Sequence, residues 1–234
     1  MFGNRELIKE NLEVVRDNMR LSCLRSHRDL RQVKLIAVSK TKPVSDLLKA
    51  YDYGVRDFGE NKVQELLSKY GELPRDVRWH LIGHLQRNKV KQIIDKVFLI
   101  HSVDSLPLAE EIEEQADKKD RVVNVLVEVN IGNEESKFGV DADQAYEMVR
   151  SITELPHVSI KGLMCIAPYT EDPESNRRYF RKMRSISDDI NGKLGEARLS
   201  VLSMGMTGDY EVAIEEGATM IRVGTGIFGK RQLL

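Results

Sequence analysis

Eight short apolar segments alternate with helix-like segments along the whole chain, and this alternation restricts the possible fold more than any other feature. The first, VKLIAVS at 33–39, places a Leu-Ile-Ala-Val run between polar residues. Apolar, β-branched runs of this length are typical of strands buried on both faces, as in a parallel sheet. The other seven predicted strands are 55–58, 77–82, 97–100, 122–129, 158–166, 199–204 and 220–223.

The segments between these strands have helical periodicity. The longest, predicted at 174–194, places Phe180, Met183, Ile186 and Ile190 on one face. Further helices are predicted at 4–26, 43–54, 63–70, 83–94, 104–118, 141–153 and 209–216.

Strict alternation of strands and helices favours a parallel sheet with helices outside it. Eight repeats in 234 residues predict a single α/β domain over 1–234, a (β/α)8 TIM barrel near the lower size limit of that fold. We expect the extra N-terminal helix to occupy the position that the missing eighth helix leaves open. An open, doubly wound sheet is the alternative.

Composition and charge exclude several classes of protein. The chain is 41% hydrophobic and 31% charged with a formal net charge of -1, which does not favour nucleic acid or anionic lipid as partners. It has neither an apolar run of membrane-spanning length nor an N-terminal signal pattern, so we expect a cytoplasmic protein without a membrane partner. Cys23 and Cys165 are too few for a disulfide framework or a zinc cluster.

In a barrel of this kind the functional groups come from the carboxyl ends of the strands and the loops after them. Lys40 follows the first predicted strand and Asn61 the second. A lysine at the mouth of a buried strand is partly desolvated, which lowers its pKa and favours the nucleophilic amine. The alternative is a solvated lysine that ends a strand.

The loops after the last two strands are rich in glycine, and loops at these positions often bind phosphate in such barrels. Their glycines let backbone amides approach an anion, and Thr207 and Thr225 add hydroxyl groups. We also expect the amides that begin the 209–216 helix to point there. The candidate residues of this anion site are Ser203, Met206, Thr207, Gly224 and Thr225. Two ordinary glycine turns are the alternative.

Arg222 lies within the apolar strand at 220–223, and a buried arginine needs a partner because it keeps its charge. That partner is either a carboxylate of the barrel such as Glu128 or a ligand atom that accepts a hydrogen bond.

Three familiar motifs lack the context that they require. The residues 224–229 match G-x-G-x-x-G, but the chain ends five residues later and we expect no helix to follow. The near match to a P-loop at 224–231 has Arg231 in place of Ser or Thr. His80 and His84 have the spacing of a metal pair, but a strand and a turn are predicted there, so no metal is expected.

The sequence resembles the pyridoxal 5′-phosphate (PLP) homeostasis protein family, the YggS/PROSC group, over nearly its whole length. The segments that carry the resemblance are VSKTKP at 38–43, FGENKVQE at 58–65, WHLIGHLQRNK at 79–89, KFGV at 137–140, GLM at 162–164 and SMGMTGDYEVAIEEGATMIRVGTGIFG at 203–229. The fold that this implies is the barrel domain of alanine racemase, fold-type III of the PLP proteins.

The resemblance implies a role for each candidate residue. Lys40 would hold PLP as a Schiff base, Arg222 would face the pyridine nitrogen, and Asn61 would lie beside the ring. The segments 203–208 and 224–226 would bind the phosphate. Thr207 stands where many members are expected to have Ser, which keeps the hydroxyl group.

An arginine beside the pyridine nitrogen donates a hydrogen bond and disfavours its protonation, so the ring would be a poor electron sink. We therefore expect a non-catalytic PLP carrier or regulator, possible partners being PLP-dependent apo-enzymes. The alternative is a racemase-type enzyme, which needs a second acid/base group that Tyr169 or Tyr210 would have to supply. A weaker alternative is a barrel enzyme for phosphorylated metabolites without PLP. Because the racemase dimerisation domain is not expected after Leu234, we predict a monomer.

Overall fold

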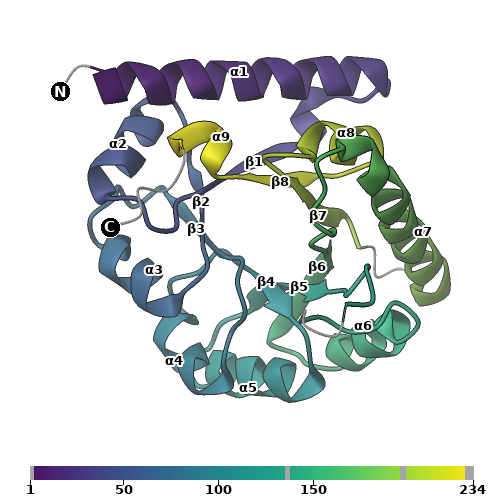
Figure 1. Ribbon diagram of the computed structural model, residues 1–234. Helices are drawn as coiled ribbons and strands as arrows, with labels where there is room; N and C mark the ends of the chain where they lie inside the picture. Colours follow the sequence, from purple (N-terminus) through teal and green to yellow (C-terminus); the bar gives the residue numbers. More distant parts are fainter. Residues whose placement is uncertain (1–2, 135–137, 196–198, 230–234) are drawn as a thin grey trace.

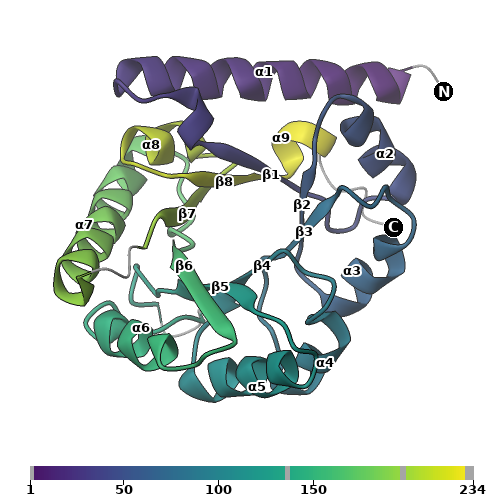
Figure 2. The ribbon, with the colours of Figure 1, turned by 180° about the vertical axis from the view of Figure 1, so that it is seen from behind.

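Eight parallel strands close into a barrel in the computed structural model, which describes residues 3–134, 138–195 and 199–229 (Figures 1 and 2). The strands are β1 (Lys34–Val38), β2 (Asp57–Glu60), β3 (Arg78–Leu81), β4 (Leu99–Val103), β5 (Val123–Glu128), β6 (Val158–Met164), β7 (Val201–Met206) and β8 (Met220–Val223). All eight predicted strands are present, with ends shifted by at most three residues. The first strand pairs with the last, which confirms the barrel and rules out the open sheet.

Helices surround this barrel, and each expected helix is present in some form. They are α1 (Gly3–Arg25), α2 (Val44–Asp52), α3 (Val63–Tyr70), α4 (Val90–Ile93), α5 (Leu106–Asp117), α6 (Ala145–Thr153), α7 (Arg177–Leu194), α8 (Tyr210–Glu215) and α9 (Thr225–Phe228). Among the described residues, none of these helices is both long and apolar enough to cross a membrane.

Two helices differ from the prediction. In the segment predicted as a turn and helix over 83–94, the helical part is limited to a 3-10 turn at Arg87–Lys89 and α4. The residues 82–86 that follow β3 are not helical, and Leu85 among them is buried. A second difference lies within the 224–229 motif, where no helix was predicted, whereas the residues after Gly229 lie outside the described part of the chain. The short helix α9 forms because Ile227 and Phe228 are buried beside α1, where Asn11 Nδ2 donates to the Ile227 carbonyl at 2.9 Å.

The N-terminal helix α1 occupies the expected outer position, beside α2, α8 and α9 (Figure 1). Its apolar stripe is buried there, with Ile8, Leu12 and Val15 each 3% exposed or less. Burial of this stripe stabilises the outer ring at the place where, within residues 224–229, β8 is followed only by the single turn of α9.

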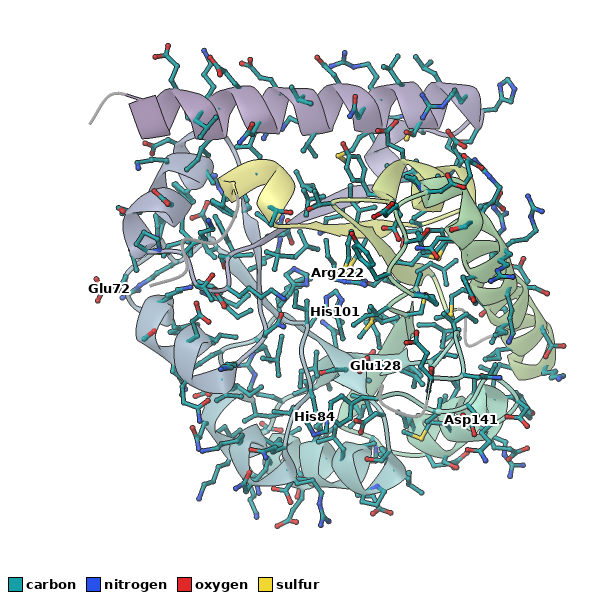
Figure 3. All side chains as sticks on the ribbon, viewed as in Figure 1. Glu72, His84, His101, Glu128, Asp141 and Arg222 are labelled. Atoms are coloured by element: carbon teal, nitrogen blue, oxygen red, sulfur yellow. The ribbon has the colours of Figure 1, made fainter. Side chains whose placement is uncertain are left out.

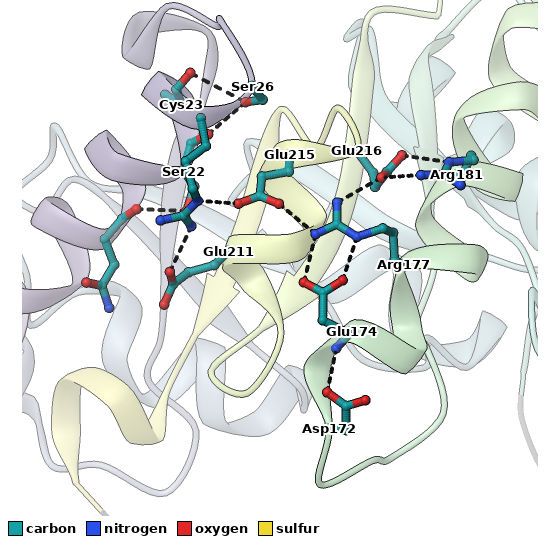
Figure 4. A network of polar contacts seen from close by, with 12 residues as sticks. Ser22, Cys23, Ser26, Asp172, Glu174, Arg177, Arg181, Glu211, Glu215 and Glu216 are labelled. Atoms are coloured by element: carbon teal, nitrogen blue, oxygen red, sulfur yellow. Dashed lines mark hydrogen bonds and ion pairs between the residues drawn. The ribbon is translucent and has the colours of Figure 1, made fainter.

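A network of ion pairs ties α1, α7 and α8 together at the side of the barrel (Figure 4). Arg25 of α1 donates to Glu215 at 2.5 Å and to Glu211 at 3.1 Å. Arg177 of α7 donates to Glu215 and Glu216, at 2.7 and 2.9 Å. Exposed pairs contribute little singly, but a shared network holds its helices in one arrangement. It therefore fixes α8, the helix that follows the loop after β7.

The barrel interior has an apolar layer and a polar layer. A small apolar cluster, separate from the main core between sheet and helices, comes from β1, β4, β5, β6 and β8. Its members are Ile36, Leu99, Leu126, Met164 and Met220. Ile36 is the register partner of Arg222, so both side chains are on the same face of the sheet. The polar layer contains Arg222 together with buried histidines of β3 and β4.

Candidate functional site

A cavity of about 470 Å³ opens at the carboxyl ends of the strands. The residues that line it come from β1, β5, β7 and β8 and from the segments after every strand except β4. The predicted site residues that it brings together are Lys40, Asn61, Met206, Thr207, Arg222, Gly224 and Thr225. Ser203 is the exception, because it is fully buried behind Arg222 and lies outside the cavity lining.

The turn that carries Lys40 is held from behind by buried charges. The Ser39 hydroxyl donates to Glu60 Oε1 at 2.6 Å, and Lys69 Nζ donates to the Ser39 carbonyl at 2.9 Å and to Glu60 Oε1 at 2.8 Å. The backbone of Thr41 has a φ of 64°, a left-handed value that a β-branched residue adopts only under restraint. Its amide donates to Glu65, which also accepts from Lys69 at 2.7 Å. Lys40 therefore projects from a rigid turn at the cavity wall.

Glu60 is the most strongly buried carboxyl in this cluster. It is 0% exposed, and its Oε2 has no hydrogen-bond partner among the described residues. Burial raises the pKa of Glu60, although hydrogen bonds from Lys69 and Ser39 oppose the shift. The stability of the Lys40 turn therefore depends on Lys69.

Donors for an anion gather between β7 and β8. Thr207 Oγ1 lies 3.4 Å from the Gly224 amide nitrogen and 3.3 Å from that of Gly226. A Cβ on Gly226 would come within 2.9 Å of Val223 Cγ1, so this close approach requires glycine. In the part of the chain that the structure describes, the amides of Thr207, Gly208 and Thr225 donate to no other residue. These groups fit a phosphate at the cavity wall.

The helix predicted over 209–216 is α8, and its N-cap residue Asp209 makes no side-chain hydrogen bond to the helix start. Instead, the Asp209 carboxylate accepts from the Met206 amide at 2.7 Å and from Asn176 Nδ2 at 2.9 Å. Asp209 therefore shapes the loop after β7, and the contribution of the first α8 amides to anion binding stays a prediction.

Arg222 is 4% exposed and is held at both ends of its guanidinium group. Its Nη1 donates to Ser203 Oγ at 2.6 Å and its Nη2 to the Cys165 carbonyl at 2.8 Å. The alternative of a direct ion pair with Glu128 is therefore not what the structure contains. Figure 3 shows Arg222, His101 and Glu128 toward the centre of the barrel.

Glu128 is a cavity residue that the sequence suggested only as an ion-pair partner. It lies at the end of β5 and is 6% exposed. Burial, with the nearby charge of Asp104, raises the pKa of Glu128 to about 7, against the opposing charge of Arg222. A glutamate that ends a mostly apolar strand, as in VNVLVE, is the signal that identifies such a residue from sequence.

His80 and His84 lie in different environments. His84 lines the cavity, its Nδ1 lies 3.1 Å from Asp104 Oδ2, and its ring stacks on Phe138 with centroids 3.8 Å apart. His80 is fully buried inside the barrel, hydrogen-bonded to His101 and Asp57. The described residues contain no group of three His, Cys, Asp or Glu side chains that could bind a metal.

The two tyrosines considered for a racemase also lie away from the described cavity lining. Tyr169 is 93% exposed, and the hydroxyl of the buried Tyr210 accepts from Asn18 of α1 at 3.1 Å. Neither tyrosine faces Lys40 as a second base in this arrangement.

Comparison with known proteins finds relatives that match nearly the whole chain. The family model described as "alanine racemase, N-terminal domain" matches residues 10–232. The pyridoxal phosphate homeostasis protein of Aquifex aeolicus is 46% identical over 95% of this chain and 98% of its own length.

Solved structures of similar proteins have the same fold. A protein from Bifidobacterium adolescentis superposes with a TM-score of 0.92 at 37% identity, covering 97% of this chain and 96% of the other. PipY of Synechococcus elongatus, solved with PLP bound, has a TM-score of 0.82 at 36% identity, covering 95% of this chain and all of PipY. Similarity at this level over nearly the full length of each protein shows that this chain belongs to the pyridoxal phosphate homeostasis protein family, within the alanine racemase N-terminal domain group.

Proposed function

We propose that this chain binds PLP covalently through Lys40 and acts in PLP homeostasis as a carrier or regulator. The observation that carries the proposal is the cavity at the strand ends, which combines a lysine, a buried arginine and a set of anion donors. When bound, PLP supplies an aldehyde that condenses with a primary amine and releases water. The PLP-bound PipY structure supports this choice of ligand.

Each cavity residue has a task in this proposal. The rigid turn at Ser39 and Thr41 presents the Lys40 amine to the aldehyde. The hydroxyl of Thr207 and the amides of Gly208 and Thr225 bind the phosphate. Arg222 donates toward the pyridine nitrogen, and Asn61 lies beside the ring. Ser203 acts indirectly, because it contacts Arg222 rather than the cavity.

Arg222 also supports a carrier over an enzyme. A guanidinium keeps its protons, so it donates to the pyridine nitrogen and leaves that nitrogen unprotonated. The ring then withdraws electrons weakly, and carbanion chemistry is poorly supported. A racemase-type activity is the second candidate, because Glu128 with a pKa of about 7 could accept and return a proton within the cavity. The cytoplasmic location, the monomeric state and transfer to apo-enzymes stay predictions.

Lys40→Ala is expected to abolish covalent retention of PLP. Borohydride treatment of the wild-type protein loaded with PLP should leave a pyridoxyl group on the peptide that contains Lys40, identified by mass spectrometry. The control is Lys62→Ala, which removes an exposed lysine that does not line the cavity and should leave the adduct in place. An adduct on another lysine, or an unchanged adduct yield in Lys40→Ala, would refute the proposed attachment.

Sustained racemisation of amino acids is not expected from the PLP-loaded protein. Incubation with L-alanine in deuterated water, followed by chiral chromatography and mass spectrometry, measures both inversion and deuterium exchange at Cα. Steady turnover that disappears in Glu128→Gln would replace the carrier with the racemase-type enzyme. Turnover that persists in that variant would assign the proton transfer to another group.

A further inference from the structure

Arg222 is one end of a chain of buried hydrogen bonds that passes through the barrel interior. Its Nη1 contacts Ser203 Oγ at 2.6 Å, and Ser203 Oγ lies 3.0 Å from His101 Nδ1. His101 Nε2 lies 2.9 Å from His80 Nδ1, and His80 Nε2 lies 3.0 Å from Asp57 Oδ1. All five residues are buried, with exposed fractions of 0 to 5%.

The far end of the chain is a carboxylate at the opposite mouth of the barrel. Asp57 begins β2, where it receives two hydrogen bonds from Arg78, at 2.8 and 2.6 Å. Lys34 is at the start of β1, and its Nζ lies 3.6 Å from Asp57 Oδ1. Burial alone would raise the pKa of Asp57, but the hydrogen bonds from Arg78 and His80 hold it well below its usual range. Asp57 is therefore an anion that can only accept hydrogen bonds.

This fixed acceptor determines the direction of every bond in the chain. Since Asp57 accepts, His80 carries its proton on Nε2, which leaves its Nδ1 as an acceptor. His101 must then donate from Nε2, which leaves its own Nδ1 to accept from the Ser203 hydroxyl. Burial lowers the pKa of His80 and that of His101, which agrees with two neutral rings. The lone pairs of Ser203 Oγ are left for Arg222.

We propose that Ser203, His101, His80 and Asp57 are positioning residues for Arg222, and that their single proton order holds its guanidinium as a donor facing the cavity. The expected effect on PLP binding rests on the proposed PLP function. The proton order itself does not, because it is a property of the protein without ligand. With Nη1 bound to Ser203 and Nη2 to the Cys165 carbonyl, the group is fixed at two points. Its remaining N–H groups are then available at the cavity wall.

The proton order has a direct test that does not require PLP. Histidine tautomers are read from nitrogen-15 shifts and long-range proton couplings in two-dimensional NMR of the labelled apo protein. We expect His80 and His101 to be neutral with the proton on Nε2 at pH 7. His157 is an internal control, because its pKa is raised by a hydrogen bond to Glu113 and it should take up a second proton as the pH falls. A proton on Nδ1 of His80 or His101, or a charged ring at pH 7, overturns the proposal.

The consequence for Arg222 is tested with a double-mutant cycle on PLP affinity. His101→Leu removes the acceptor of the Ser203 hydroxyl and should raise the PLP dissociation constant about tenfold, the value of one well-formed hydrogen bond. In an Arg222→Gln background the same change should have little further effect, because there is no guanidinium left to position. His157→Gln is the matched control and should bind as the wild type does. Additive effects in the two backgrounds would reduce His101 to a packing role.

These two experiments separate this inference from the proposed function. If the wild-type protein fails to bind PLP, the proposed function fails. The histidine tautomers alone then decide whether the buried hydrogen bonds between Arg222 and Asp57 all run in one direction. If PLP binds normally but the tautomers differ from those expected, only the positioning inference fails.

Discussion

Lys69→Met is expected to lower the free energy of unfolding by about 3–5 kcal/mol, the usual cost of removing one partner from a buried ion pair. Lys69 is 5% exposed and donates to the Ser39 carbonyl, Glu60 and Glu65, while Glu60 is 0% exposed. Without the ammonium group, the Ser39 hydroxyl is the one donor to the Glu60 carboxylate that remains among the described residues. Urea unfolding of the apo protein at pH 8, followed by circular dichroism, measures the loss.

The chain offers a closely matched control for this experiment. Lys118 also pairs with a glutamate four residues earlier on a helix, but both side chains are more than half exposed. Lys118→Met should therefore leave the urea midpoint of unfolding close to that of the wild type. Adding Glu60→Gln to Lys69→Met should recover much of the loss, because the stranded charge is then gone. A loss under about 1 kcal/mol in Lys69→Met would contradict the role assigned to this pair.

The same variant also tests the connection from this cluster to Lys40. Since Lys69 and Glu65 hold the Ser39 carbonyl and the Thr41 amide, their loss frees the turn between them. We expect weaker PLP retention in Lys69→Met even under conditions where the protein is fully folded.

Glu128→Gln is expected to stabilise the apo protein by about 3 kcal/mol at pH 8.5 relative to wild type, and by far less below pH 5. The folded-state pKa of Glu128 is raised from an ordinary value of 4.5 to about 7. Between these values the folded protein holds a proton that the unfolded chain has released, so stability falls as the pH rises. The contribution is fully present below pH 4.5 and is lost as the pH rises through 7. Glutamine keeps the shape of the side chain without its charge.

Urea unfolding at several pH values between 4.5 and 8.5 measures this difference between the variant and the wild type. Each pH unit within the interval changes it by about 1.4 kcal/mol. Glu110→Gln is the control for the loss of a carboxylate as such, because Glu110 is exposed on α5. A constant difference for Glu128→Gln would show that Glu128 titrates normally in the folded protein.

Much of the architecture follows from local patterns in the sequence. Alternating strand and helix periodicities predicted all eight strands, the order of the helices and the outer position of α1. The carboxyl ends of parallel strands meet on one face, which is why Lys40, Asn61 and Arg222 could be expected in one cavity. The helix α9 was not predicted, because four residues are too few to show a helical periodicity and because its formation depends on contact with α1.

The hydrogen bonds between buried side chains inside the barrel could not be predicted from the sequence, for a different reason. His101 and Ser203 are 102 residues apart, and Arg222 reaches both Ser203 and the Cys165 carbonyl. Such contacts depend on strand register and on barrel closure. Neither can be predicted from the spacing of residues along the chain. Glu128 suggested an ion pair with Arg222, but only the structure shows that Ser203 takes that place.

The sequence by itself determined the barrel, the face on which the site lies and the lysine that projects into it, because side-chain periodicity and turn residues act over a few positions. The tertiary structure alone decided which buried polar groups meet. Removing a polar group from water requires a hydrogen-bond partner at a fixed distance and direction, and the closed sheet supplies that partner from strands far apart in the chain.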